Sequence, residues 1–271
     1  MSKESVSAFR RMVYGYYRRC GRHDLPWRQT ADPYCILISE VMLQQTQVPR
    51  VVEKYASFIR RFPNFAVLAQ APLRAVLKEW QGLGYNRRAI AVKKIAEIVQ
   101  SDYAGTLPQD MDVLVKLPGI GVYTAAAIGA FAFNRPTVFI ETNIRAVFIH
   151  TFFGDRTNVS DKEILPLIEK MLDRKNPQKW YGALMDYGVM LKNEFANPAR
   201  RSSHHKRQSR FEGSNRQLRG RILKLLTASE GLTKAAIAKA LNAEPAKIDM
   251  NLADLAQEDF IKRVGHRCKI V

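Results

Sequence analysis

The segment Leu117–Ala125, which reads LPGIGVYTA, constrains the fold of this chain more than any other stretch. Pro118 interrupts a helical pattern, and the glycines at 119 and 121 let the backbone turn tightly and approach another group closely. The small residues that follow suit a helix that packs closely on a neighbour. N–H groups at the start of such a helix point outward, where the helix dipole favours an anion. The segment therefore predicts two helices joined by a turn that binds a phosphate.

Apolar residues recur at helical spacing along most of the chain. They predict helices over Val48–Phe62, Leu73–Trp80 and Arg87–Gln100, with prolines near the helix ends. No convincing pair of strands joined by a hairpin precedes residue 255. We therefore expect a mainly α fold, and 271 residues suffice for one large or two modest domains.

The net charge of +18 and the pI near 10.0 indicate a polyanionic partner. No apolar run approaches the length that crosses a bilayer, and the N-terminus lacks the apolar core of a signal peptide. We accordingly expect a cytoplasmic protein that associates with the nucleoid if it binds DNA, and no membrane partner. The three cysteines are too scattered for a disulfide framework and too few for a four-thiolate cluster.

The character of the sequence changes over Asn197–Asn215. This stretch is basic and has few apolar residues, so it is predicted to be a linker or an arm between residues 1–196 and 216–271. A solvated loop and an arm that contacts nucleic acid both fit. The adjacent histidines at 204 and 205 have no carboxylate or thiolate beside them, and we expect no metal there.

Residues 216–271 are predicted to form a small unit that resembles a winged helix. Helices are expected over Arg216–Leu226, Thr233–Leu241 and Ala246–Gln257, and two short strands turn at Gly265–His266. The helix that would read bases, Ala246–Gln257, contains Asp249 and Asp254, and Glu258 and Asp259 follow it directly. Because acids match phosphates poorly, packing against the main domain or a protein contact is at least as compatible with this helix as base reading.

Four further blocks complete the pattern: Leu25–Arg28 (LPWR), Ser39–Val48 (SEVMLQQTQV), Trp80–Tyr85 (WQGLGY) and Leu184–Gly188 (LMDYG). With these blocks, roughly residues 8–195 resemble the helix-hairpin-helix DNA glycosylase superfamily, and most closely its MutY-type adenine DNA glycosylases. The Ser39–Val48 block is highly specific, whereas the hairpin alone marks only the superfamily.

The resemblance implies two helical lobes with the target base flipped into the cleft between them, because a stacked base hides its glycosidic bond. Gln44, Gln45 and Tyr85 match positions that fill or wedge the duplex in this family. Double-stranded DNA with a mispaired or damaged base is the implied partner of what we expect to be a monomer. The residues expected to contact DNA are Arg28, Gln44, Gln45, Thr46, Tyr85, Gly119, Gly121, Val122, Thr124, Arg200, Arg201 and Arg207.

Four residues match catalytic positions of the family. Glu40 matches the general acid that protonates the leaving purine, and its apolar neighbours should raise its pKa. Glu141 stands where the family has an Asp that stabilises the oxocarbenium-like sugar or adds to it, and Tyr123 and Asn143 match its hydrogen-bonding partners. The longer side chain at 141 fits a compensated variant, an altered substrate or impaired chemistry; the retained Glu40, Tyr123 and Asn143 favour an active enzyme.

Three departures from the family refine this interpretation. Tyr123 replaces the Lys with which bifunctional relatives such as endonuclease III form a Schiff base, so the resemblance implies a monofunctional glycosylase. The region after Gly188 lacks the cysteines of the usual [4Fe–4S] cluster, so no such cofactor is expected, and a monovalent cation at the hairpin is the alternative left open. The Nudix-like domain that reads 8-oxoguanine is replaced by the shorter residues 216–271.

The sequence thus indicates a base excision repair glycosylase, most simply for adenine opposite guanine or 8-oxoguanine. A related branch that removes thymine or uracil from mismatches with guanine also has Tyr in the hairpin and is the alternative enzyme. A non-catalytic protein that binds damaged DNA is the alternative from another class, and the acids Glu40 and Glu141 separate it from a catalyst.

Overall fold

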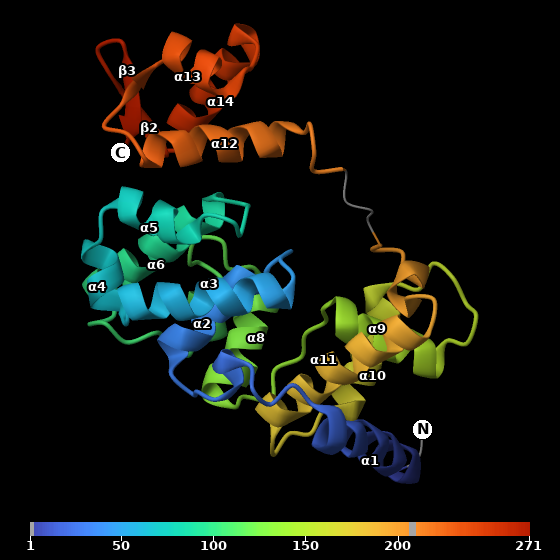
Figure 1. The fold of residues 1–271 in the computed structure, drawn as a ribbon. Coiled ribbons are helices and arrows are strands. Elements are labelled where there is room, and N and C mark those ends of the chain that lie inside the picture. The colour runs from blue at the N-terminus through green and yellow to red at the C-terminus, as the bar shows by residue number, and fades with distance from the viewer. Residues whose placement is uncertain (1–2, 206–209) are drawn as a thin grey trace. The chain divides into compact units, whose positions relative to one another are not determined.

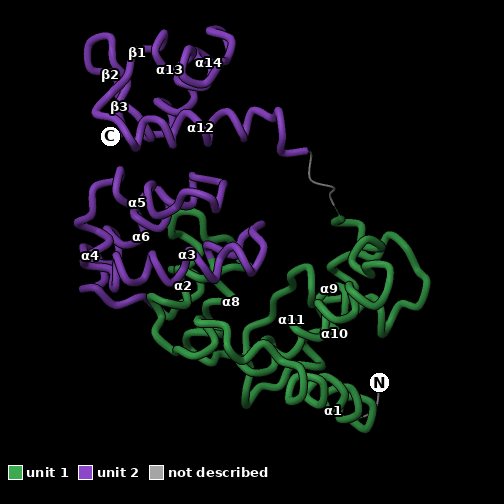
Figure 2. Tube along the Cα trace, in the orientation of Figure 1, with its two compact units in different colours: residues 1–40, 109–207 green, residues 41–108, 208–271 purple. Residues whose placement is uncertain are grey.

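The computed structural model describes residues 3–205 and 210–271 and is mainly α-helical, as predicted (Figure 1). Its elements divide into two compact units (Figure 2). Unit 1 comprises residues 1–40 and 109–207, and unit 2 comprises residues 41–108 and 208–271. Each unit therefore combines segments that are far apart in the sequence.

Unit 1 is a group of helices around an apolar core. Buried side chains of this core include Val13, Ile144, Phe148, Trp180 and Leu184. The elements of the unit are α1 (Lys3–Cys20), η1 (Pro26–Arg28), most of α2 (Pro33–Leu43), α7 (Met111–Leu114), α8 (Val122–Phe133), α9 (Thr142–Phe152), α10 (Asp161–Met171), α11 (Pro177–Glu194) and η2 (Pro198–Arg201).

Unit 2 combines helices from the middle of the chain with its C-terminal residues. The three helices predicted from apolar spacing are present, with ends that differ from the prediction by at most two residues. The elements are α3 (Val48–Arg61), α4 (Phe65–Gln70), α5 (Leu73–Trp80), α6 (Arg87–Asp102), α12 (Asn215–Thr227), β1 (Leu232–Thr233), α13 (Lys234–Leu241), α14 (Pro245–Gln257), β2 (Ile261–Val264) and β3 (Arg267–Ile270).

The C-terminal elements have the order of a winged helix. The strands form an antiparallel sheet in the order β1-β3-β2, in which Cys268 of β3 pairs with Leu232 on one side and Arg263 on the other. The hairpin turns at Gly265–His266, as predicted, and Gly265 has a φ of 58°. β1 was not predicted, because two residues are too short to show an alternating pattern.

The first residues of the predicted linker or arm at Asn197–Asn215 form the short helix η2 and bind to unit 1. Pro198 and Ala199 are buried in η2. The N–H of Val159 donates to the carbonyl of Arg201 at 3.0 Å, and the N–H of Ser203 donates back to Val159 at 3.0 Å. These contacts tie the start of the stretch to the segment before α10.

Within the described ranges, no helix combines the length and apolar character needed to span a membrane.

Candidate active site

The predicted phosphate-binding turn lies between α7 and α8 of unit 1. Asp110 caps α7 by accepting hydrogen bonds from the N–H groups of Asp112 (2.7 Å) and Val113 (3.3 Å). Gly119 has a φ of 74°, in the left-handed region that favours glycine. Gly121 then precedes α8, and no side chain caps this helix start. Its first turn is exposed and has the geometry that favours an anion.

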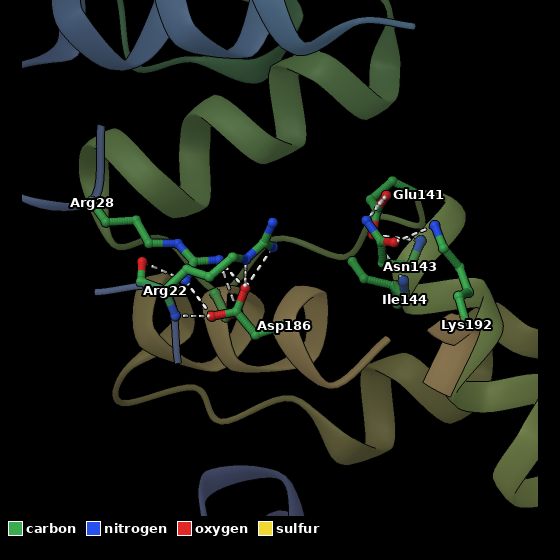
Figure 3. A network of polar contacts seen from close by, with 8 residues as sticks. Arg22, Arg28, Glu141, Asn143, Ile144, Asp186 and Lys192 are labelled. Atoms are coloured by element: carbon green, nitrogen blue, oxygen red, sulfur yellow. Dashed lines mark hydrogen bonds and ion pairs between the residues drawn. The ribbon is translucent and has the colours of Figure 1, made fainter. Parts of the chain in front are cut away.

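Glu141 is the N-cap of α9. Its Oε1 accepts hydrogen bonds from the N–H groups of Asn143 and Ile144, both at 2.8 Å. Its Oε2 accepts a third, at 3.1 Å, from the side-chain amide of Asn143 (Figure 3). All three donors stabilise the carboxylate, so the longer side chain at this position is held in one geometry rather than left loose.

Lys192, which was not predicted from the sequence, completes this cluster from α11. Its ammonium donates to Asn143 Oδ1 at 2.7 Å, which turns the amide of Asn143 towards Glu141 (Figure 3). Burial raises the pKa of Glu141 above its usual range, while the two backbone N–H donors and the charges of Lys192 and Arg145 act in the opposite direction. The sequence feature that could have indicated this role is the single Lys that follows the apolar residues of α11.

Glu40 lies near the end of α2, among buried apolar neighbours such as Leu37, Ile38 and Val41. Burial, together with the negative charge of Glu141, raises the pKa of Glu40 to about 7. The charges of the two carboxyl groups therefore interact. Glu141 accepts three N–H hydrogen bonds, whereas burial is the main influence on Glu40. Two neighbouring carboxyl groups in different environments are typical of a site in which one acts as an acid and the other as a carboxylate.

Tyr123 lies on the first turn of α8 and is 47% exposed. The N–H groups that donate to Glu141 belong to Asn143 and Ile144. The structure therefore brings together Glu40, Glu141 and Asn143 of the predicted catalytic set and leaves the Tyr123 hydroxyl outside their hydrogen-bond network. Val122 is 67% exposed beside it, and Thr124 follows in the same turn.

Arg28, which was predicted to contact DNA, binds a buried carboxylate in the structure. Its guanidinium donates to both oxygens of Asp186, at 2.5 and 2.9 Å, and only 12% of its side chain is exposed (Figure 3). Arg22 binds the same carboxylate at 2.6 Å. Burial opposes the charged form of Asp186, but both arginines outweigh it and lower its pKa. Arg28 therefore joins η1 to α11.

The residues predicted to fill the duplex lie in unit 2, in two neighbouring loops. Gln45 and Tyr85 both have left-handed backbones, with φ of 53° and 47°. Such conformations are strained for residues other than glycine and concentrate at functional sites. Thr46 Oγ1 joins the loops by donating to the carbonyls of Gln44 (3.3 Å) and Leu83 (3.4 Å).

Arg88, which was also not predicted as a site residue, holds these two loops. It is 8% exposed, and Nη1 donates to the carbonyls of Val41, Met42 and Gln44 at 2.6–2.9 Å. Its Nη2 donates to Thr46 Oγ1 and to the carbonyls of Leu83 and Gly84 at 3.0–3.2 Å. The carbonyls at the C-terminal end of α2 lack helical partners, and Arg88 satisfies them. Its position one residue inside α6 gave no such indication.

Of the basic residues predicted on the linker, Arg200 is exposed and Arg201 is bound to the protein. Arg201 donates to the carbonyl of Gly154 and lies 4.0 Å from Asp155. Arg207 lies outside the described residues. Arg200 thus stays a candidate for contact with nucleic acid, whereas the guanidinium of Arg201 is committed to the loop after α9.

The residues do not fit the iron–sulfur cluster of the resembled family. A [4Fe–4S] cluster needs four thiolates, and the chain has three cysteines, of which Cys20 is exposed and Cys268 is buried. Within residues 3–205 and 210–271, no group of three or more His, Cys, Asp or Glu side chains is placed to hold a metal ion.

Comparisons with known proteins show the family of this chain. The model of a family described as "HhH-GPD superfamily base excision DNA repair protein" matches residues 38–174. A protein of Buchnera aphidicola subsp. Baizongia pistaciae, named adenine DNA glycosylase, is 38% identical over 187 residues, which cover 68% of this chain and about half (52%) of that protein. A Mycobacterium tuberculosis protein of the same name is 30% identical over 273 residues, 93% of this chain and 89% of the relative.

Among solved structures, a thermostable thymine-DNA glycosylase superposes with a TM-score of 0.60 at 26% identity, over 69% of this chain and 87% of that one. The matched family region contains the hairpin, Glu40 and Glu141. The chain belongs to the HhH-GPD superfamily of base excision DNA repair proteins.

Proposed function

We propose that this protein is a monofunctional DNA N-glycosylase that removes adenine mispaired with guanine or 8-oxoguanine in double-stranded DNA. One observation carries the proposal: the buried Glu40, with a pKa raised to about 7, lies close enough to Glu141 for their charges to interact, and the Glu141 carboxylate accepts three N–H hydrogen bonds. The names of the two relatives support adenine as the base. The exposed first turn of α8 supplies a site for a DNA phosphate.

The two acids divide the chemistry between them. As the glycosidic C–N bond breaks, its electron pair passes to the departing base, and Glu40 gives its proton to a ring nitrogen of that base. The sugar left behind carries positive charge, which the carboxylate of Glu141 stabilises. Water then adds to C1′ and loses a proton. The cluster of Asn143, Ile144 and Lys192 around Glu141 keeps the negative charge where the positive charge develops.

The proposed lack of lyase activity rests on the hairpin. Lyase chemistry requires an amine that attacks C1′ and forms a Schiff base, and Tyr123 supplies no amine. Lys192 has an amine, but it donates to Asn143 Oδ1. Treatment with borohydride during the reaction should therefore trap little covalent protein–DNA adduct, and a high yield of adduct would contradict monofunctional chemistry.

One panel of labelled duplexes tests the proposal, with A·8-oxoguanine, A·G, T·G, U·G and hypoxanthine as the target positions. We expect strand cleavage only after alkali, and only where adenine is the target, since base release leaves an alkali-labile abasic site. A protein that binds all duplexes without releasing any base would be the damage-binding alternative. Release of thymine or uracil would establish the second candidate enzyme, which the likeness to the solved thymine-DNA glycosylase favours.

Replacing Lys192 with Met should shift the acidic limb of the rate–pH profile to higher pH. The ammonium of Lys192 lowers the pKa of Glu141, so its loss raises this pKa, and Glu141 is then protonated at a higher pH. A shift of one pH unit slows base release on the acidic limb roughly tenfold. Single-turnover rates between pH 5 and 9 measure it. Lys192→Arg keeps the charge and should restore the profile; identical profiles for all three proteins would exclude this role.

A further inference from the structure

A groove of about 1150 Å³ lies within unit 2, between α12 and the two loops held by Arg88. Gln44, Gln45 and Tyr85 line one part of it, and Arg216 and Lys224 of α12 line another. α12 packs along α5, where Gln81 donates to Thr227 Oγ1 at 2.6 Å (Figures 1 and 2). The C-terminal residues therefore form a wall of the groove rather than a separate appendage.

The groove is strongly basic. Seven arginine or lysine side chains line it against two acidic side chains, Asp254 and Glu258. Both acids are already engaged: Glu258 binds Arg87 and Arg219 at 2.7 Å, and Asp254 lies 3.7 Å from Arg219. A surface of this composition favours a polyanion, and amide and aromatic side chains beside the cations suit nucleobases.

Tyr85 and Arg216 join the two walls of the groove. Arg216 donates to the Tyr85 hydroxyl at 3.0 Å, and its guanidinium carbon lies 5.9 Å from the centre of the Tyr85 ring. Tyr85 also has the left-handed backbone described above. The C-terminal residues thus contact the side chain that the family resemblance places against the duplex.

α14, the helix that reads bases in an ordinary winged helix, contributes an acid, Asp254, and no cation to this surface. α14 and the residue pair after it use their acids in ion pairs: Glu258 with Arg87 and Arg219, Asp259 with Lys94 at 3.5 Å, and Asp249 with Lys234 at 2.7 Å. Arg87 and Lys94 belong to α6, so this end of α14 packs against the middle of the chain. That packing agrees with the expectation drawn from the acidic sequence of α14.

We propose that the groove between α12 and the Gln44–Gln45 and Tyr85 loops binds a DNA strand, with α12 holding its phosphates and the loops contacting its bases. The proposal deepens the proposed function and rests on it for the identity of the polyanion. It assigns the winged-helix unit to DNA binding through α12, and not through α14 or the β2–β3 hairpin. It also makes the groove a DNA contact additional to the α8 turn.

The test compares two double variants of the full chain. Arg216→Ala with Lys224→Ala removes two cations from the groove, and Lys262→Ala with Arg263→Ala removes two exposed cations from β2 of the same unit. Affinity for a mismatched duplex is measured by fluorescence anisotropy across a range of salt concentrations. We expect the groove variant to bind about tenfold more weakly at 0.1 M salt and its salt slope to fall by roughly two. The β2 variant should match the unmodified chain in both quantities.

Equal losses of affinity in both variants, or a loss confined to the β2 variant, would contradict the proposal that the groove binds DNA. If the groove variant does not fold, as judged by its thermal melting, the exposed residues Arg50 and Lys224 are replaced one at a time, and each should lower the salt slope by about one. Base release at saturating protein separates the two proposals. A chain that releases no base yet loses affinity in the groove variant refutes the proposed function alone, whereas unchanged affinity with normal release refutes the groove alone.

Discussion

Glu40→Gln should slow base release by roughly a thousandfold while leaving affinity for the mismatched duplex within about threefold of the unmodified chain. General acid catalysis typically contributes 10²–10⁴ in rate, and Gln keeps the shape of Glu40 without its proton. The loss should appear in the single-turnover rate at saturating protein and not in the dissociation constant. Glu53→Gln makes the same change on the exposed face of α3 and should have no effect on either quantity.

The pH dependence of the unmodified chain provides an independent check on this role. Because Glu40 must be protonated to act and its pKa is raised to about 7, the rate should fall as pH rises through about 7. The sign for stability follows from the same shift. A carboxyl with a raised pKa binds more protons folded than unfolded, so its contribution to folding free energy is lost as pH rises from the unfolded value towards 7.

Glu40→Gln should therefore remove that pH dependence and melt at a higher temperature than the unmodified chain at pH 8, while the two melt alike near pH 4. A variant that is inactive and also less stable at pH 8 would mean that Glu40 is a structural residue. A variant that retains full activity would show that another group protonates the base, and the division of roles between Glu40 and Glu141 would be wrong.

Local features were the part of this site that could be predicted from the sequence. The apolar neighbours of Glu40 predicted a raised pKa, and the glycines of Leu117–Ala125 predicted an exposed helix start, because both effects depend on residues close in the chain. The acids of α14 likewise predicted packing rather than base reading, and the ion pairs with Arg87 and Lys94 agree. The family blocks supplied the pairing of Glu40 with Glu141, which local patterns do not reveal.

Contacts between distant residues were the part that could not be predicted. The ion pair of Arg28 could not be predicted, because its partner, Asp186, lies 158 residues away along the chain. Lys192 reaches Asn143 across 49 residues, and the start of the basic stretch is tied down by Val159. An arginine has the same charge whether its guanidinium faces solvent or binds a buried carboxylate. Its neighbours in the sequence do not distinguish the two cases.

Arg88→Ala should destabilise the protein by at least about 4 kcal/mol, measured as the free energy of unfolding in urea. The guanidinium donates to the carbonyls at the end of α2 and to those of Leu83 and Gly84, and its removal leaves buried acceptors without donors, each of which costs about 1–3 kcal/mol. Burial lowers the pKa of Arg88 to about 10, so it remains charged at neutral pH and the loss is not a titration effect.

Its neighbour provides the matched control. Arg87 has a side chain that is 76% exposed and forms a surface ion pair with Glu258, so Arg87→Ala should cost less than about 1 kcal/mol. Arg88→Lys keeps the charge but lacks the planar set of donors, and should recover less than half of the loss. If Arg88→Ala stayed within 1 kcal/mol of the unmodified chain, the loops of Gln45 and Tyr85 would have to hold their left-handed backbones without it. We do not expect this result, because strained left-handed backbones such as those of Gln45 and Tyr85 persist only where surrounding contacts impose them.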